Sequence, residues 1–150
     1  QLVDNHLRVE HNMPNCDSRE FYKGVLDENA KSVFTGRIYV KEDAQQTDAK
    51  QTNQNILLSN DADATSRPQL EIYADDVVCT HGATTGEIDD EALLYLQTRG
   101  IPKEAARTLL IYAFLNESLD DLADETFRDV LVEELLANLP GGEFIRSLYL

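Results

Sequence analysis

The residues best suited to chemistry in this sequence are Cys79 and His81, within the segment "VVCTHGATTGEID". If the apolar start of this segment forms a strand, residues i and i+2 share a face, so the thiol and the imidazole point the same way. Both groups bind iron, zinc or copper, and together they would make half of a metal site. As a nucleophile and a base they would be poorly aligned for proton transfer. A core cysteine beside a hydrogen-bonded surface histidine is the third interpretation, and the two residues alone leave all three open.

The other histidines and the other cysteine offer little further chemistry. His11 and Cys16 lie in "HNMPNCDS" and are interpreted as loop residues. The chain has two cysteines and three histidines, without the short CxxC or HxxxH spacings of zinc fingers. Cys16 and Cys79 have no disulfide framework around them, so a reducing compartment is favoured. No phosphate-loop pattern is present.

Length and charge restrict the class of protein. The 150 residues, 42% of them hydrophobic, suit one domain or one domain with a small appendage. The chain starts without Met and reads as a fragment of a longer protein. A net charge of −15 argues against nucleic acid or an anionic membrane as partner, and no apolar run approaches the length of a membrane span. The segment 87–134 holds 13 acidic and four basic residues, a net of −9, which fits either a solvated surface or a docking face for a basic partner.

The first half of the chain has the period of strands. "FYKGVLD" and "VFTGRIYV" align at an offset of 12, which matches Tyr22 with Phe34 and Gly24 with Gly36. Apolar and polar residues alternate within each segment, as in half-buried strands. Repeated strands without hairpin turns favour a solenoid with coils of roughly 24 residues. A sandwich of antiparallel strands remains the alternative.

The second half has the period of helices. Asp89 is a candidate N-cap, Gly100 a C-terminal stop and Pro102 the first residue of the next helix. A third helix is predicted from about Ser118 to just before Pro140. Its apolar side would comprise Leu119, Leu122, Thr126, Phe127, Val130, Leu131 and Leu135. The tail "EFIRSLYL" either docks on a neighbouring surface or is a disordered end.

Longer segments of the sequence resemble a known protein family. "LEIYADDVVCTHGATTGEIDDEALLYLQTRGIP" (70–102) closely resembles the C-terminal region of the SufB/SufD family of iron–sulfur cluster assembly proteins. "LRVEHNMPNCDS", "GVLDENAKSVFTGRIYV" and "ARTLLIYAFLNE" resemble the same family in the same order. The segment "QTNQNILLS" lacks the cysteine of the SufB branch, and Gly82 stands where SufB has a glutamate. Both departures point to the SufD branch.

The resemblance implies a fold and a domain arrangement. Residues 1–88 would be the last coils of a right-handed parallel β-helix, and residues 89–150 a small helical C-terminal domain. The expected class is therefore mainly β with α, as part of a longer chain.

The resemblance also implies a function, that of a non-catalytic scaffold subunit of the SufBCD complex. His81, and with a weaker claim Cys79, would handle metal in a transient iron–sulfur cluster or iron site shared with a SufB-like partner. No cofactor is expected on the isolated fragment. The β-helix would bind the SufB-like subunit, and the helical domain a SufC-like ABC ATPase. The expected location is the cytoplasm, or the plastid stroma in a photosynthetic eukaryote.

Two further expectations concern association and an alternative role. Exposed strand edges of the isolated fragment would allow it to form a homodimer. The competing functional hypothesis is an acidic β-solenoid adaptor that binds proteins and has no metal chemistry. A third hypothesis, a Cys/His hydrolase, would require activity from this chain alone.

Overall fold

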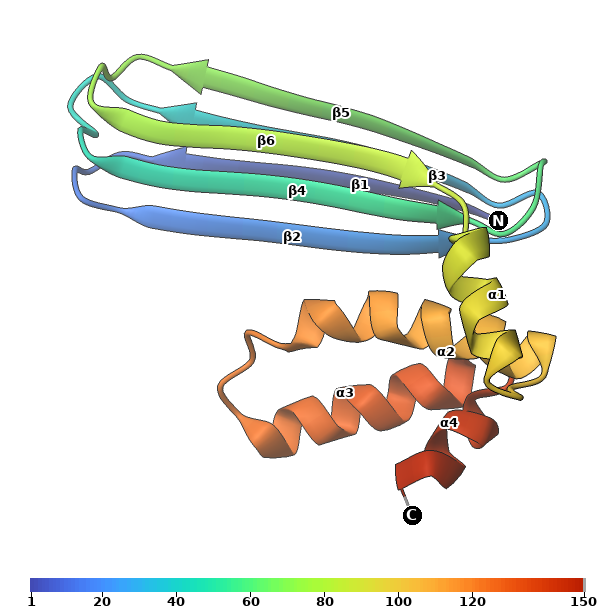
Figure 1. The fold of residues 1–150 in the computed structure, drawn as a ribbon. Helices are drawn as coiled ribbons and strands as arrows, with labels where there is room; N and C mark the ends of the chain where they lie inside the picture. The colour runs from blue at the N-terminus through green and yellow to red at the C-terminus, as the bar shows by residue number, and fades with distance from the viewer. Residues whose placement is uncertain (150) are drawn as a thin grey trace. The chain divides into compact units, whose positions relative to one another are not determined.

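The protein combines a unit of strands with a unit of helices. The computed structural model describes residues 1–149, which form two compact units, the first Gln1–Gly86 and the second from Glu87 onward. The first unit contains β1 (Leu2–His11), β2 (Asp17–Leu26), β3 (Lys31–Val40), β4 (Thr47–Leu57), β5 (Asp63–Ile72) and β6 (Val77–Gly86) (Figure 1). The second contains α1 (Asp90–Thr98), α2 (Lys103–Asn116), the 3₁₀ turn η1 (Glu117–Leu119), α3 (Glu125–Asn138) and α4 (Gly142–Tyr149). The class, mixed β with α, is the one that the sequence predicts.

The six strands form two parallel sheets. β1, β3 and β5 make one sheet and β2, β4 and β6 the other, so successive strands alternate between the sheets. Figure 1 shows the two layers, with the strands of each sheet side by side. Every paired strand runs parallel to its neighbour. The antiparallel sandwich is therefore wrong for this unit, and the prediction of parallel pairing is confirmed.

The spacing between paired strands is longer than the sequence suggested. Leu2 pairs with Lys31, 29 positions later, and Lys31 pairs with Asp63, 32 positions later. A coil of roughly 24 residues is therefore wrong. The offset of 12 relates β2 to β3, which belong to different sheets. β2 and the turn after it occupy the 14 positions 17–30, and a full return to the same sheet also needs a second strand and a second turn.

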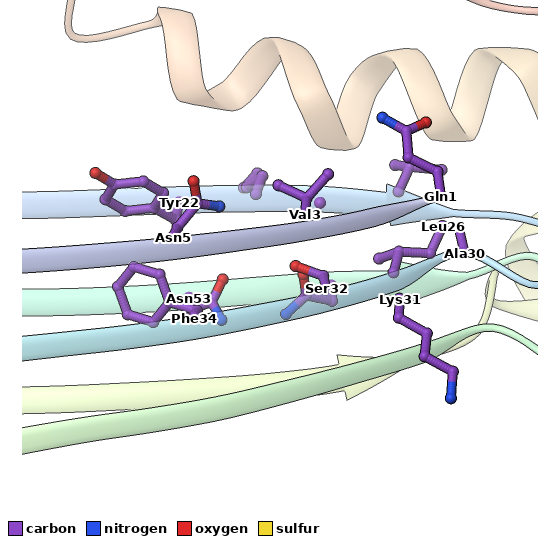
Figure 2. Close-up of a pocket in the computed structure, with 14 residues that line it drawn as sticks. Gln1, Val3, Asn5, Tyr22, Leu26, Ala30, Lys31, Ser32, Phe34 and Asn53 are labelled. Carbon is purple, nitrogen blue, oxygen red and sulfur yellow. The ribbon is translucent and has the colours of Figure 1, made fainter.

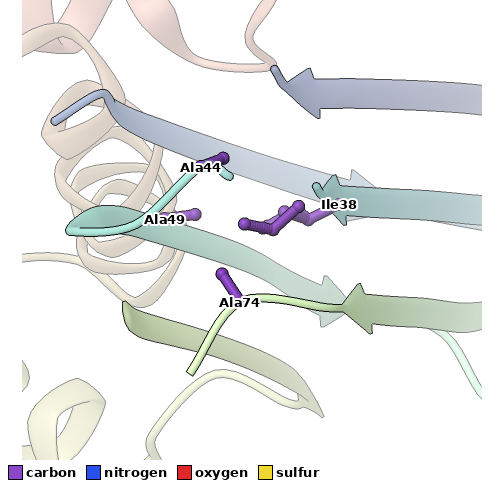
Figure 3. Packing of buried hydrophobic residues seen from close by; sticks show 5 residues of the cluster. Ile38, Ala44, Ala49 and Ala74 are labelled. Carbon is purple, nitrogen blue, oxygen red and sulfur yellow. The ribbon is translucent and has the colours of Figure 1, made fainter. Parts of the chain in front are cut away.

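The apolar core of the strand unit lies between its two sheets. Ile38 and Val40 of β3 pack with Ala49 of β4, together with Ala44 and Ala74 (Figure 3). Ile38 is fully buried, and burial of such a side chain stabilises a fold by about 1.5–3 kcal/mol. The remainder of the inner face is polar along β4, where the buried residues are Thr47, Gln51, Asn53 and Asn55. Asn53 donates to the hydroxyl of Ser66 on β5, at 2.6 Å, which offsets the desolvation of its amide.

The first helix begins and ends where its sequence signals predict. The carboxylate of Asp89 accepts hydrogen bonds from the backbone N–H groups of Glu91 and Ala92, which confirms it as the N-cap of α1. Gly100, with φ of +88°, follows the C-cap in the left-handed conformation that glycine tolerates. Pro102 is the N-cap of α2, so this helix begins at Lys103, one position later than predicted.

The third helix differs from its prediction. It begins at Glu125 rather than near Ser118, because the carboxylate of Asp124 accepts a hydrogen bond from the N–H of Phe127 and caps it there. Phe127 and Val130, assigned to the apolar side, are 53% and 60% exposed. α3 faces the core of this unit with Leu136, which packs with Tyr112 of α2 and Ile145 of α4. Leu135, from the predicted apolar side, also packs against this cluster.

The C-terminal tail forms the fourth helix. Ile145 is fully buried in the helical core, so this segment docks on its own unit as far as the structure describes it. Arg146 bonds to Glu133 of α3 and to Glu143, which connects α4 to α3 at the surface. Leu150 lies outside the described residues. Among residues 1–149, no helix has the length and apolar character needed to cross a bilayer.

Candidate metal site

The two residues of the Cys-x-His motif lie on β6, an edge strand of its sheet. Cys79 is partly buried and packs against the apolar cluster around Ile38, so it faces the space between the sheets. His81 lies two positions later on the same face, because side chains alternate along a strand. Unlike Cys79, it is exposed. The strand therefore separates a packed thiol from an accessible imidazole.

The environment of Cys79 disfavours its thiolate. Burial raises the pKa of this thiol, and the nearby Asp48 carboxylate raises it further, while a backbone hydrogen bond at Ala49 opposes them. The thiolate is the form that binds metals and attacks electrophiles. Cys79 consequently has the environment of a packing residue, whereas the imidazole of His81 is accessible.

His81 is the last member of a row of polar residues across one sheet. It pairs with Gln51 on β4, and Gln51 pairs with Glu20 on β2. Glu20 and Gln51 are 8% and 1% exposed, and the Gln51 amide donates to a carboxylate oxygen of Glu20 at 2.5 Å. The second carboxylate oxygen of Glu20 and the amide oxygen of Gln51 have no hydrogen-bond partner within residues 1–149.

A glycine from the opposite sheet makes room for this row. A Cβ atom added to Gly36 of β3 would lie 2.4 Å from the Nε2 atom of Gln51. The amide of Gln51 therefore lies directly against the backbone of Gly36. Neither Glu20 nor Gln51 stands out in the sequence, because an inward polar residue on an alternating strand resembles an outward one. A glycine in a strand is the one available signal, since it often marks a close approach.

The strand carries fewer ligands than a complete metal site needs. In the part of the chain that the structure describes, no three His, Cys, Asp or Glu side chains are grouped to hold a metal ion. Imidazole is nevertheless an ordinary iron ligand, and His81 is accessible for it. Any iron held here would share ligands from elsewhere.

His11 and Cys16, the other two residues considered for chemistry, make local contacts in the strand unit. His11 ends β1 and is buried, with its Nε2 atom 2.9 Å from the hydroxyl of Ser18. Its assignment to a loop is therefore wrong. Cys16 lies between β1 and β2, and its thiol contacts the carbonyl oxygen of Pro14 at 3.6 Å.

A cavity of about 270 Å³ opens between the sheets away from the motif. Figure 2 shows Tyr22, Asn53 and Phe34 among the side chains that line it, with Val3 and Leu26 nearer the ends of their strands. Cys79 and His81 are not part of its lining. The cavity therefore adds no ligand to the candidate site.

The chain is similar to a known protein family and to several of its members. Residues 1–114 match the family model described as "SUF system FeS cluster assembly, SufBD core domain". The chain is 42% identical over 142 residues to the Escherichia coli "Iron-sulfur cluster assembly protein SufD", with 95% of this chain and 34% of that protein covered. It is 39% identical to a Synechocystis SufBD family protein (81% and 27% covered) and 35% identical to "Protein ABCI7, chloroplastic" of Arabidopsis thaliana (86% and 27%). The chain thus spans between 27% and 34% of the length of these relatives.

Proposed function

This chain belongs to the SufB/SufD family of iron–sulfur cluster assembly proteins and is SufD-like, and we propose that it acts as a non-catalytic scaffold subunit in a SufBCD complex. In this role it contributes His81 to a site where a nascent cluster is built between two subunits. The cluster is the cargo of the complex and is passed on. The observation that carries the proposal is the accessible imidazole of His81 on β6, the last strand of its sheet.

We propose that the strand unit is part of a right-handed parallel β-helix. Its support is the alternation of successive strands between two parallel sheets, at spacings of 29 to 32 residues. Connections between parallel strands of one sheet are right-handed in about 98% of cases, which favours this handedness.

The proposed contact with a SufB-like subunit is made at β6. Within the described residues this strand pairs only with β4, so one backbone edge is available for a partner. Its second half, 82–86, consists of small exposed residues. Added Cβ atoms at Gly82 and Gly86 would meet no heavy atom within 4 Å, so a second chain has room to approach. His81 adjoins this segment and can share a ligand set with the partner.

The iron chemistry that this chain offers comes from its imidazole. A neutral imidazole binds ferrous iron through one nitrogen. A single imidazole binds iron weakly, so thiolates or carboxylates of the SufB-like subunit complete the proposed site. Cys79 remains a candidate ligand only where partner binding or iron displaces its proton, because burial raises the pKa of its thiol.

We propose that the helical unit binds a SufC-like ABC ATPase. All 13 acidic residues of segment 87–134 are exposed, and they would attract a basic surface. Phe127 and Val130 are neighbours at i and i+3 on α3, where they form an exposed apolar pair amid these charges. Such a pair within a polar rim is typical of a protein–protein contact.

The proposed location follows from the relatives. They include bacterial proteins and one chloroplast protein, so we place this function in the bacterial cytoplasm or the plastid stroma.

Anaerobic reconstitution tests the scaffold role. The full-length protein is mixed with a SufB-like subunit, ferrous iron and sulfide, and cluster formation is followed by optical absorption. We expect a cluster on the pair of subunits and none on the SufD-like protein alone. A pair that binds tightly yet takes up no iron or sulfide would support the protein-binding adaptor in its place.

A further inference from the structure

The orientation of the Gln51 amide is determined by its neighbours. A carboxylate accepts hydrogen bonds and cannot donate them, so the nitrogen of the amide must face Glu20. The backbone of Gly36 lies against the same amide and leaves no space for it to move in that direction. Gln51 is 1% exposed, and the row from Glu20 thus holds its side chain in one orientation.

This orientation leaves the Gln51 Oε1 atom as a buried acceptor without a donor in the described part of the chain. A buried carbonyl oxygen that lacks a hydrogen bond destabilises the fold, because it has lost its hydrogen bonds to water. Such an atom in a folded protein is expected to have a partner in the working state. On the side of Gln51 away from Glu20, the neighbour in the row is His81, the paired residue on β6, and adjacent strands lie about 4.8 Å apart.

His81 can supply the missing donor through its ring. A neutral imidazole has one N–H donor and one nitrogen with a free lone pair, and the proton can sit on either nitrogen. A hydrogen bond at one nitrogen selects the tautomer and directs the other nitrogen toward a metal. Because His81 is exposed, its ring can rotate about its side-chain bonds to reach Oε1.

We propose that Gln51 is a positioning residue, whose Oε1 atom accepts a hydrogen bond from one ring N–H of His81 and leaves the other ring nitrogen free as the iron ligand. Glu20 holds the amide of Gln51 in place for this contact. The inference rests on the proposed function, because the unprotonated ring nitrogen serves as a ligand only if His81 binds iron.

The tautomer of His81 is the direct test. Full-length protein labelled with ¹⁵N at the histidine ring nitrogens is examined by NMR at a pH where imidazole is uncharged, and His81→Ala assigns the resonances. One tautomer should dominate in the wild type. Gln51→Met, which preserves shape and removes the acceptor, should lower the tautomer ratio about fivefold, the effect of a single neutral hydrogen bond.

A matched control lies on the same strand. Gln54 is three positions from Gln51 and lies on the opposite face of β4, so Gln54→Met should leave the ratio unchanged. An unchanged ratio in Gln51→Met would overturn the proposal. The Gln51→Met variant removes a buried polar group and could fail to fold. The tautomer populations of the wild-type protein therefore provide a second test. Equal populations of both tautomers in the folded protein would overturn the proposal as well.

The tautomer experiment and the test of the proposed function can fail independently of each other. Loss of iron and sulfide from the His81→Ala complex, with a tautomer indifferent to Gln51, would leave the scaffold role standing and refute the positioning role. A tautomer that depends on Gln51, with normal iron and sulfide in His81→Ala, would reduce the hydrogen bond to a structural contact and refute the assembly role of His81.

Discussion

The ring centroids of Tyr22 and Phe34 lie 4.8 Å apart, although the two residues belong to different sheets. The rings are tilted by 48°, a geometry in the favourable range for aromatic pairs. Phe34 is 2% exposed, so the contact is part of the interior of the strand unit. Together with the cluster around Ile38, it holds the two sheets face to face.

Removal of the Phe34 ring should destabilise the strand unit. Phe34→Ala deletes a buried ring and its contact with Tyr22, and we expect a loss of about 3–5 kcal/mol in the free energy of unfolding. Urea denaturation of the full-length protein measures the loss. Met13→Ala is the control, because Met13 is 67% exposed and its replacement should change stability by less than about 0.5 kcal/mol. Similar losses in both variants would contradict the assigned interior.

Two glycines with opposite surroundings test the row that ends at His81. Gly36→Ala places a methyl group against the buried amide of Gln51, so we expect a loss of about 1–3 kcal/mol from overpacking. Gly82→Ala meets open space on β6 and should be nearly neutral by itself. Thermal unfolding of the two variants measures the difference. If Gly36→Ala were as stable as Gly82→Ala, Gln51 would not lie against β3 as described.

The raised pKa of the Cys79 thiol has a measurable consequence. Its alkylation by iodoacetamide should be slow at neutral pH and should accelerate with a midpoint above the ordinary cysteine value, because only the thiolate reacts and burial opposes its formation. A Cys16→Ser background isolates the signal in this part of the chain, and mass spectrometry gives the rate at each pH. A midpoint below the ordinary value would identify Cys79 as an activated thiol and restore its claim as a metal ligand.

The exposed apolar pair on α3 should contribute to ATPase binding. Phe127→Ala combined with Val130→Ala should weaken the complex with the SufC-like ATPase at least about tenfold, the effect of losing about 1.4 kcal/mol at an interface. Calorimetry measures the affinity. Tyr73→Ala, an equally exposed aromatic site in the strand unit, should leave it unchanged. An unaltered affinity after the α3 substitutions would exclude this pair from the docking surface.

Salt should affect the same complex mainly through its rate of formation. The exposed acidic residues of segment 87–134 would attract a basic partner over a distance, and dissolved ions screen that attraction. Stopped-flow association should therefore slow as salt is added, while dissociation changes little. A salt effect confined to dissociation would argue against steering by these charges.

Much of the fold can be predicted from local patterns. Alternation predicts the strands, and the absence of hairpin turns predicts their parallel pairing. The Asp89 cap predicts the start of α1. The length of a coil cannot be obtained in this way, because the similarity of "FYKGVLD" to "VFTGRIYV" relates strands that face each other across the core rather than strands that pair. Local similarity does not distinguish these two relationships.

The site was only partly predictable for a physical reason. Cys79 and His81 stand out by their residue types, and their common face follows from strand geometry. Glu20 and Gln51 join them through pairing between strands about 30 residues apart, which depends on the register of the whole sheet. The outward face of Phe127 likewise depends on where α3 begins, and the cap at Asp124 competes with several nearby acidic residues as the candidate start.

The proposed role of His81 in cluster assembly is tested most directly by the iron and sulfide content of the complex purified anaerobically from cells that express His81→Ala. His81 is exposed, so its replacement should change the free energy of unfolding by less than about 1 kcal/mol, and a thermal melt confirms that the fold is intact. Co-purification of the SufB-like and ATPase subunits confirms assembly. We predict a sharp loss of iron and sulfide from an otherwise complete complex. Wild-type iron and sulfide content in that complex would contradict the account.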